Sequence, residues 1–428
     1  MNRLFILILC MSLASFAVLA AETDGPVTAI NDPRLKTFAT QKRQQTEEMA
    51  AKLHLDVPPE IREFFRAAEA GDWNAVSNSY ARIQRLTSQT PSSITMPGYT
   101  NILSVPVHET LGAYDEFHRF NEPMLQKFAD GVLHSIPSGS IYFGGTDPGR
   151  FIITAVRDTA ASPDIFVLTQ KFVITQNALA DNRYTDYLRL VYGERLSMPT
   201  TNDVQEVFQK YADDIRARQN RGEPIGAGEQ VRVDADHIVH LGGPENVMAV
   251  NGILTKWIFD HNKDKHEFYV EESYVIPWMF PYMEPHGLIL KLNKEPMKEL
   301  GPAVVTQDRQ FWDTLIRELL ADPKFLGNDW VRGHYAKLRA SIGGLYVYRR
   351  LTTEAEAVFK QAQELCPTSP EASFYLAQLY MQAGRLDDAI AALKSFQQRV
   401  PSDRHIQDAI DQLEKAKQPR GDLEHPEK

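Results

Sequence analysis

The chain has 428 residues and a formal net charge of −10. That modest acidity, without any stripe of Lys and Arg, argues against nucleic acid or an anionic lipid surface as a partner, because both reward clustered cations. A chain of this length is expected to form two or three domains and to bury a sizeable core.

Residues 1–20 have the pattern of a secretory signal peptide. An apolar run extends with few breaks to Ala20, and Val18 and Ala20 supply a small-x-small cleavage pattern. The run is short for a membrane span, which needs about 20 apolar residues. We therefore expect an extracytoplasmic protein, periplasmic or secreted, and retention of the segment as an anchor is the alternative. Cleavage would remove Cys10 and leave Cys366 without a partner for an internal disulfide.

Residues 21–130 are expected to form a linker with a polar helix, followed by a helical hairpin. Apolar residues repeat at helical spacing over 61–68, Gly71 breaks the run, and a second apolar stripe begins at Trp73. A further helix is expected over 123–134, because its apolar residues recur at the same spacing.

Residues 131–300 alternate between short β-branched or aromatic runs and helical stripes. The expected strands cover 140–143, 164–175, 266–273 and 288–292, with a small hairpin over 231–241, and the expected helices carry apolar stripes over 184–192, 204–215 and 247–258. Strands that alternate with helices are typical of a three-layer α/β domain with a mostly parallel sheet. We predict that fold class, flanked by an N-terminal helical region and a C-terminal helical region.

Residues 301–417 carry an internal repeat with a period of about 34 residues. Its signature positions are Gly343, Tyr346, Ala355, Phe359 and Pro367 in the first copy and Ala377, Tyr380, Ala389 and Pro401 in the second. The small residues let paired helices approach closely, the aromatic residues fill the space between them, and each proline ends a unit. This is the pattern of the tetratricopeptide repeat, so we expect a protein partner bound through helical repeats. Residues 418–428 are expected to form a disordered tail.

Two such repeats are fewer than the roughly three that are stable alone. They must therefore lean on a helix over 311–320, on a capping helix over 403–417, or on the α/β domain. The array is then either a partner-binding groove or a structural brace, and the sequence favours the groove.

Four segments resemble a known family. They are IPSGSIYFGGTDPGRF (136–151), TQNALAD (175–181), FYVEES (268–273) and PYMEPHG (281–287). Together with the repeats they resemble the soluble extracytoplasmic part of a group of bacterial envelope proteins. Some relatives in that group join this part to a membrane domain similar to protein O-mannosyltransferases. The resemblance implies an envelope membrane protein as a partner, and it implies no catalytic residues, because this sequence shows no such membrane half.

Polar residues follow three expected strands at their carboxyl ends, where open parallel sheets bind ligands. The candidate ligand-binding residues are Gly144, Gly145, Asp147 and Arg150 after the first strand, Asn177 and Asp181 after the second, Glu271 and Glu272 after the third, and His286 from the following loop. The glycine loop suggests a phosphate cradle. Asp147, however, would place a negative charge there and would serve as a helix N-cap, so a structural turn is the favoured alternative.

The sequence contains no complete catalytic or metal-binding motif. Adjacent Glu271 and Glu272 point to opposite faces of a strand, which argues against a glycosidase with paired carboxylates. The same reasoning argues against His237 and His240 as joint ligands of a metal. We expect no metal and no cofactor. The sequence predicts an exported, non-catalytic scaffold or ligand-binding protein, with a glycan or a small molecule as candidate ligand. The alternative is an enzyme or accessory subunit in envelope glycan or glycosyl transfer.

Overall fold

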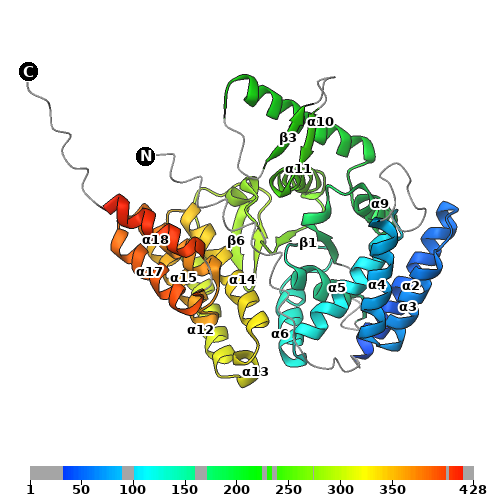
Figure 1. Cartoon of the computed structure of the whole chain (residues 1–428), viewed down its shortest axis with the longest axis horizontal. Helices are drawn as coiled ribbons and strands as arrows, with labels where there is room; N and C mark the ends of the chain where they lie inside the picture. Colours follow the sequence, from blue (N-terminus) through cyan, green and yellow to red (C-terminus); the bar gives the residue numbers. More distant parts are fainter. Residues whose placement is uncertain are drawn as a thin grey trace, which may run out of the picture. The chain divides into compact units, whose positions relative to one another are not determined.

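The computed structural model describes residues 32–88, 101–159, 171–223, 229–233, 239–272, 274–401 and 404–417. The chain divides into two compact units, Met1–Lys298 and Glu299–Lys428, and many of their elements are labelled in Figure 1. The expected signal peptide and the expected C-terminal tail lie outside the described residues. No helix in the described part of the chain is long and apolar enough to cross a membrane.

The first unit begins with α-helices. They are α2 (Pro33–Leu53), α3 (Pro59–Ala70), α4 (Trp73–Ser88), α5 (Ser104–Arg119) and α6 (Glu122–Leu133). Helices α3 and α4 form the hairpin that the sequence predicts, because α3 buries Phe64 and Phe65 and ends at Gly71 in the left-handed region, with φ of 77°. Helix α5, which the sequence analysis did not predict, packs against α2, α3 and α4.

A small mixed sheet follows. Its strands are β1 (Ile141–Gly144), β2 (Phe172–Thr175), β5 (Phe268–Val270), β6 (Met283–His286) and β7 (Ile289–Leu292), in the order β2-β1-β5-β7-β6. Strand β1 pairs in parallel with β2 and β5, whereas β7 pairs antiparallel with β5 and β6. Strands β3 (Gln230–Val233) and β4 (Val239–Gly242) form the separate hairpin expected over 231–241.

The predicted three-layer α/β domain with a mostly parallel sheet is wrong, because the described residues are mostly helical and the five-stranded sheet is mixed. The reason lies after β5. A parallel return needs a crossover, usually a helix that packs on the sheet, but the chain that leads to β6 holds only the 3₁₀ turn η5 (Pro277–Tyr282). Strands β6 and β7 then form a tight hairpin at Gly287, with φ of 62°. The Pro-rich aromatic segment is therefore where the sheet turns antiparallel.

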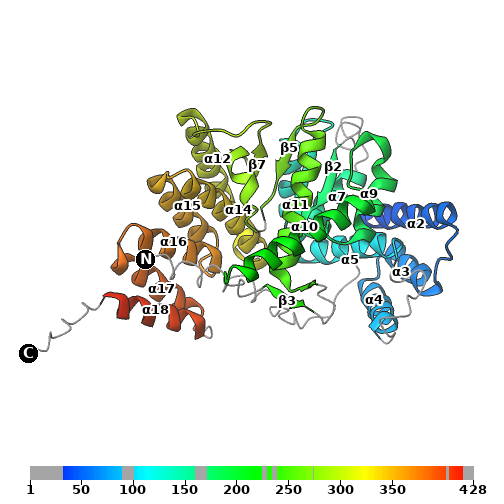
Figure 2. The ribbon, with the colours of Figure 1, turned by 90° about the horizontal axis from the view of Figure 1, so that it is seen from above.

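The helices around the sheet come from the segments between the strands. They are the π-helical turn η1 (Pro148–Ile152), α7 (Ile153–Thr159), the 3₁₀ turn η3 (Gln176–Ala178), α9 (Asn182–Tyr192), the 3₁₀ turn η4 (Gly193–Arg195), α10 (Thr201–Asn220) and α11 (Pro244–Asn262). Figure 2 shows α7, α9, α10 and α11 gathered around the strands of this unit.

Helix α9 covers the free edge of β2. The hydroxyl of Tyr192 accepts a hydrogen bond from Val173 N at 3.0 Å and donates one to Val173 O at 2.7 Å. Two turns earlier on the same helix, the hydroxyl of Tyr184 accepts from Thr175 N at 2.7 Å. These main-chain groups face away from β1 and would otherwise need water or another strand. The two tyrosines therefore complete the hydrogen bonding of an edge strand.

The second unit is wholly helical in its described residues. Its helices are α12 (Pro302–Leu320), α13 (Pro323–Leu326), α14 (Asp329–Tyr348), α15 (Thr352–Leu365), α16 (Pro370–Gln382), α17 (Leu386–Arg399) and α18 (Arg404–Lys417). From α14 onward each helix packs on the next, so the helices follow one another as a stack (Figure 2). Helix α12 packs against α15 near the start of the stack, and α18 packs against α17 at its end.

Candidate functional site

Glu271 lies at the carboxyl end of β5 and is 1% exposed. Tyr142 of β1 donates its hydroxyl to Glu271 Oε2 at 2.8 Å, and Thr146 donates its hydroxyl to Oε1. Burial, and then the charge of Glu271, raises the pKa of Tyr142 well above its usual value, so the phenol stays protonated as a donor. The strand-end carboxylate is therefore bound by donors of the protein itself.

The glycine loop after β1 closes over this carboxylate. A Cβ atom at Gly149 would overlap the carboxylate of Glu271, so the position admits only glycine. Gly149 N donates to Thr146 Oγ1 at 3.1 Å. Thr146 therefore caps the helix start, and the expected cap at Asp147 is wrong by one residue. Asp147 already has helical φ and ψ of −62° and −46° and accepts no capping hydrogen bond; its carboxylate pairs with Arg150.

The ends of β1 and β2 come together. Asn177 donates from its side-chain amide to Gly145 O at 2.7 Å. Gly144, the last residue of β1, lies so close to the backbone of Gly149 that a side chain there would collide with it. Glu272 follows β5 and is half-buried. The loop, Asn177 and Glu271 thus form one packed group at this end of the sheet.

Asp181 and His286 serve other parts of the unit. Asp181 caps α9, because its Oδ1 accepts from Arg183 N at 2.9 Å, and Oδ2 pairs with the Arg183 guanidinium at 2.5 Å. His286 lies on β6, with Nε2 2.7 Å from Ser135 O. The candidate residues therefore form separate groups rather than one cluster around a cleft.

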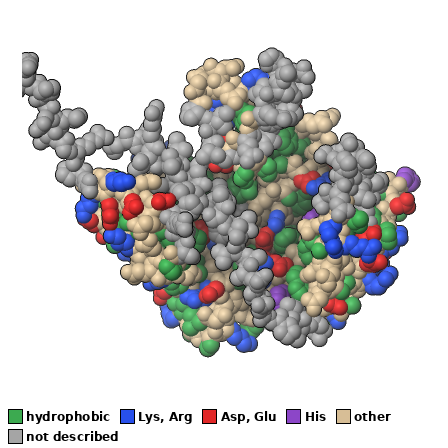
Figure 3. Space-filling view, viewed as in Figure 1, with side chains coloured by type: hydrophobic (Ala, Val, Ile, Leu, Met, Phe, Trp, Pro, Cys, Tyr) green, Lys and Arg blue, Asp and Glu red, His purple; other side chains and the backbone are tan. Residues whose placement is uncertain are grey.

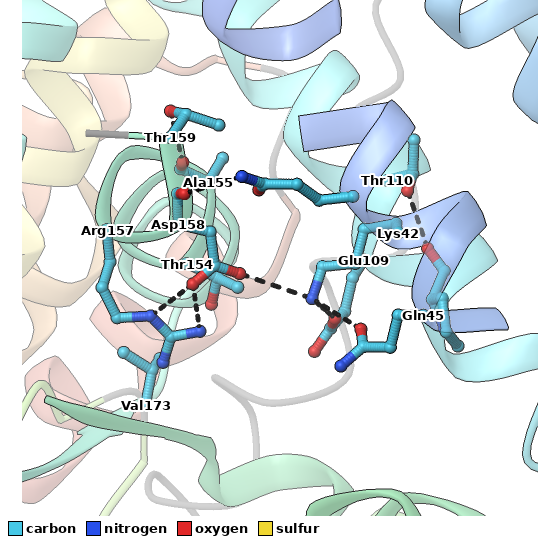
Figure 4. A network of polar contacts seen from close by, with 12 residues as sticks. Lys42, Gln45, Glu109, Thr110, Thr154, Ala155, Arg157, Asp158, Thr159 and Val173 are labelled. Carbon is cyan, nitrogen blue, oxygen red and sulfur yellow. Dashed lines mark hydrogen bonds and ion pairs between the residues drawn. The ribbon is translucent and has the colours of Figure 1, made fainter. Parts of the chain in front are cut away.

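A buried ion-pair cluster that the sequence analysis missed joins α2, α5 and α7 (Figure 4). The Lys42 side chain is 4% exposed, and its Nζ lies 2.5 Å from Glu109 Oε2 and 3.5 Å from Asp158 Oδ2. Arg157 Nη2 lies 2.6 Å from Asp158 Oδ1. Tyr187 of α9 donates to Glu109 Oε2 at 2.7 Å. We call these residues the Lys42–Arg157 cluster.

Both cations of the Lys42–Arg157 cluster are held in the charged form. Burial alone would lower the pKa of Lys42, but the carboxylates of Glu109 and Asp158 outweigh burial and raise it. For Arg157, burial is likewise outweighed by Asp158, and its pKa is raised. Burial, followed by Glu109, raises the pKa of Tyr187 well above its usual value. Lys42 and Arg157 therefore stay protonated across the physiological pH range.

In the second unit, the repeat-signature residues lie at the contacts between helices. A Cβ atom at Gly343 of α14 would overlap the ring of Phe359 on α15. Tyr380 donates to Glu356 Oε1 at 3.0 Å. The three small signature residues are at most 3% exposed, and they are Ala355, Ala377 and Ala389. The two signature prolines lie in the turns after α15 and α17, and they are Pro367 and Pro401.

A second buried ion pair, also missed from the sequence, fastens α12 to the repeats. Arg339 Nη1 lies 2.8 Å from Asp308 Oδ2, and each side chain is 1% exposed. Tyr346, a signature residue, donates to the same oxygen at 2.7 Å. Arg339 Nε and Nη2 donate to Gln361 Oε1 at 2.9 and 2.8 Å, and the guanidinium lies 5.0 Å from the Trp312 ring centre. We call this group the Arg339–Asp308 network.

A family model described as a tetratricopeptide repeat matches residues 351–413. The match runs from the start of α15 into α18, so it covers the helix predicted as a cap as well as the second repeat. No curated protein matches the chain. The chain therefore carries tetratricopeptide repeats, a helical array whose general role is to bind other proteins.

Among the residues that the structure describes, no group of three or more His, Cys, Asp or Glu side chains is placed to hold a metal ion. His237, considered above as a metal ligand, lies outside the described residues.

Proposed function

We propose that this protein is an exported scaffold that holds a protein partner on its tetratricopeptide repeats. The observation that carries the proposal is the repeat array itself, matched over residues 351–413 and built from helices α14 to α18. Stacked helical repeats present an extended surface suited to an elongated partner.

The repeat array has a cover at each end within its own unit. Helix α12 is fastened by the Arg339–Asp308 network, and α18 buries Ile406, Ile410 and Leu413 at helical spacing. Two repeats alone would leave apolar faces exposed, and a brace would need another domain to cover them. Because the unit supplies both covers itself, the array does not need another domain to bury its two ends, which supports the groove over the brace.

The binding surface that we propose lies on the first helices of the repeats. Helices α14 and α16, the first helices of the two repeats, pack against one another more closely than the second helices α15 and α17 do. We therefore infer that the first helices line the inner, concave side of the helical stack. Val347 and Tyr348 on α14 are equivalent in position to Met381 and Gln382 on α16, one period later. None of the four is buried. Tyr348 is 49% exposed. An exposed tyrosine is a common anchor in protein interfaces.

Lys, Arg, Asp and Glu are interspersed over the face of the repeats seen in the space-filling view (Figure 3). On that face, the mixture argues against steering of a partner by one sign of charge. Since the proposed surface includes the exposed Tyr348, we favour a partner held by apolar and hydrogen-bond contacts, and on the family resemblance this partner is an envelope membrane protein.

The test places a photo-cross-linking amino acid at Tyr348, at Gln382 and, as the control, at exposed Lys394 on α17. We expect one partner to be captured from native cells at the first two positions and not at the third. The captured protein is then purified, and its affinity is measured for the wild type and for Tyr348→Ala. A loss of about 2 kcal/mol or more is expected if Tyr348 is an anchor. Equal capture at all three positions, with equal affinities, would reject the proposed surface.

Export is proposed from the apolar segment over residues 1–20. Sequencing the N-terminus of the protein isolated from its native cells tests this directly. A mature chain that starts close after Ala20, found outside the cytoplasm, is the expected outcome. A protein that keeps its first residues and stays in the cytoplasm would contradict export.

The alternative function, an enzyme or accessory subunit in envelope glycan transfer, gains no support from the strand ends. Catalysis would need carboxylates that converge on an open cleft. Glu271 is instead buried among donors, Asp147 pairs with Arg150, and Asp181 caps α9.

A further inference from the structure

A cavity of about 200 Å³ lies beside the Lys42–Arg157 cluster in the first unit. Its described walls come from α2, α5, α7, α9, η4 and the start of β2. None of the residues that we selected from the sequence lines it. The cavity is thus distinct from both the strand-end group and the repeats.

The cavity wall carries more positive than negative charge. Its cations are Lys42, Arg157, Lys171 and Arg195, and its carboxylates are Glu109 and Asp158. Both carboxylates are already taken, because Lys42 pairs with both and Arg157 pairs with Asp158. Among the described residues, Lys171 and Arg195 are therefore left without a carboxylate partner.

Of Lys171 and Arg195, Lys171 gives the stronger evidence for an anion site. It is 3% exposed, and among the described residues its ammonium has no hydrogen bond and no ion pair. Its Nζ is not among the fully enclosed polar atoms, so the ammonium is open to the cavity, and a cation held there without a carboxylate favours an anion. Burial lowers the pKa of Lys171 to about 8, so it is still mostly charged at neutral pH.

Arg195 stands at the exposed side of the same wall. Within the described part of the chain, its guanidinium donates to the main-chain carbonyls of Tyr192 at 3.2 Å and Val191 at 3.1 Å, and it lies 5.8 Å from the Phe172 ring centre. The fork of an arginine suits a carboxylate or phosphate group. The hydroxyls of Tyr187 and Tyr192, which also line the cavity, are already engaged in the contacts described above.

We propose that this cavity binds a small anionic metabolite, whose carboxylate or phosphate group pairs with Lys171 and is reached by Arg195 from the exposed side. The anion pairs with Lys171, for which no described residue supplies a carboxylate, and it neutralises the surplus positive charge of the described wall. A volume of about 200 Å³ is many times the roughly 10–15 Å³ that one water needs on the same measure. The cavity therefore has room for a short phosphate ester or a dicarboxylate.

The test measures binding to the full mature chain by calorimetry and by thermal shift, at constant ionic strength. The probes are inorganic phosphate, glycerol 3-phosphate, acetate and succinate, with glycerol and succinamide as neutral analogues. The phosphate and carboxylate arms show which oxyanion is preferred. We expect at least one anion to bind and to raise the melting temperature, and the neutral analogues to have no effect.

Three variants make the test specific to the cavity. Lys171→Met keeps the length of the side chain, removes its charge, and should weaken anion binding by at least about tenfold. Arg195→Gln should weaken it less, because Arg195 lies at the exposed side. Lys210→Met removes an exposed lysine of α10 and should leave the affinity unchanged. Circular dichroism melts establish that each variant is folded.

The pH dependence gives a second readout that a purely structural role would not produce. Affinity of the wild type should fall by about tenfold per pH unit above a pH of about 8, because Lys171 loses its proton there. Lys171→Arg should bind without that fall. The proposal is overturned if no anion binds the wild type, or if wild type and Lys171→Met respond alike to every anion.

Discussion

The two units bury cations in different ways. In the second unit, the Arg339–Asp308 network is closed, because Arg339 is paired with Asp308 and Gln361, and both members of the ion pair are 1% exposed. In the first unit, the Lys42–Arg157 cluster borders a cavity, and no residue that the structure describes pairs with Lys171 beside it.

The difference indicates two uses of buried charge. A closed network fixes how one helix sits on another and leaves nothing for a ligand to satisfy. An incomplete network leaves positive charge at the wall of a cavity, where water or a small solute can reach it. Four experiments with substituted chains can break or sharpen this comparison.

The largest effect is expected from Arg339→Met. The change leaves Asp308 buried without its cation, so the free energy of unfolding should fall by about 3–5 kcal/mol. Urea unfolding of the full chain, followed by circular dichroism, measures this loss. Arg309→Met, at the exposed neighbouring position of α12, should change stability by no more than about 0.5 kcal/mol. A loss near that of the control would show that the network is not closed as described.

Lys42→Met should cost less, about 1.5–3 kcal/mol, although Lys42 is almost as deeply buried as Arg339. The reason is that Glu109 and Asp158 border the cavity and can be hydrated once their cation is removed. The same unfolding experiment applies, with exposed Lys52→Met on α2 as the control. If Lys42→Met proves as costly as Arg339→Met, the distinction between an open and a closed network fails.

Two adjacent glycines of α14 test the packing of the repeats. Gly343→Ala should destabilise by about 1–3 kcal/mol, because the new methyl group would overlap the ring of Phe359. Gly344→Ala should stabilise by up to about 1 kcal/mol, because no atom lies within 4 Å of a Cβ there and alanine favours the helix. Thermal melts of the pair give opposite shifts. Shifts of the same sign would show that α14 and α15 are not in close contact at Gly343.

The smallest effect concerns the pH dependence of stability without ligand. Burial lowers the pKa of Lys171 from 10.5 to about 8. The unfolded chain therefore binds more protons than the folded chain between these values, and the contribution of Lys171 to stability rises with pH across that window. The stability of the wild type relative to Lys171→Met should increase from pH 8 towards pH 10.5. A difference that stays constant with pH would show that the ammonium is fully hydrated.

The sequence predicted what depends on local pattern. Helix α3 was predictable because its apolar residues recur at helical spacing and Gly71 ends the run. The repeats were predictable because small residues, Gly343 and Ala377, occupy the same position one period apart. The topology of the sheet could not be predicted in the same way. Strands of three or four residues carry little pattern, and the direction of β7 depends on a connection that contains no helix.

The buried charges were missed for a related reason. Lys42 stands in a polar segment and Lys171 within the strand expected over 164–175, so neither residue is unusual in the sequence. Each becomes unusual only when distant segments surround it. Glu271, by contrast, was identified, but its neighbours could not be. Only the structure shows that the hydroxyls of Thr146 and Tyr142 donate hydrogen bonds to this carboxylate.

The tyrosines of α9 couple the local opening of the edge strand β2 to the local opening of the helix. Amide protons on the outer side of an edge strand usually exchange readily with solvent, but those of Val173 and Thr175 are bound by Tyr192 and Tyr184. Their exchange requires α9 to lift away, so strand and helix open together as one cooperative unit. While α9 stays in place, that edge of the sheet cannot be extended by a strand from another chain.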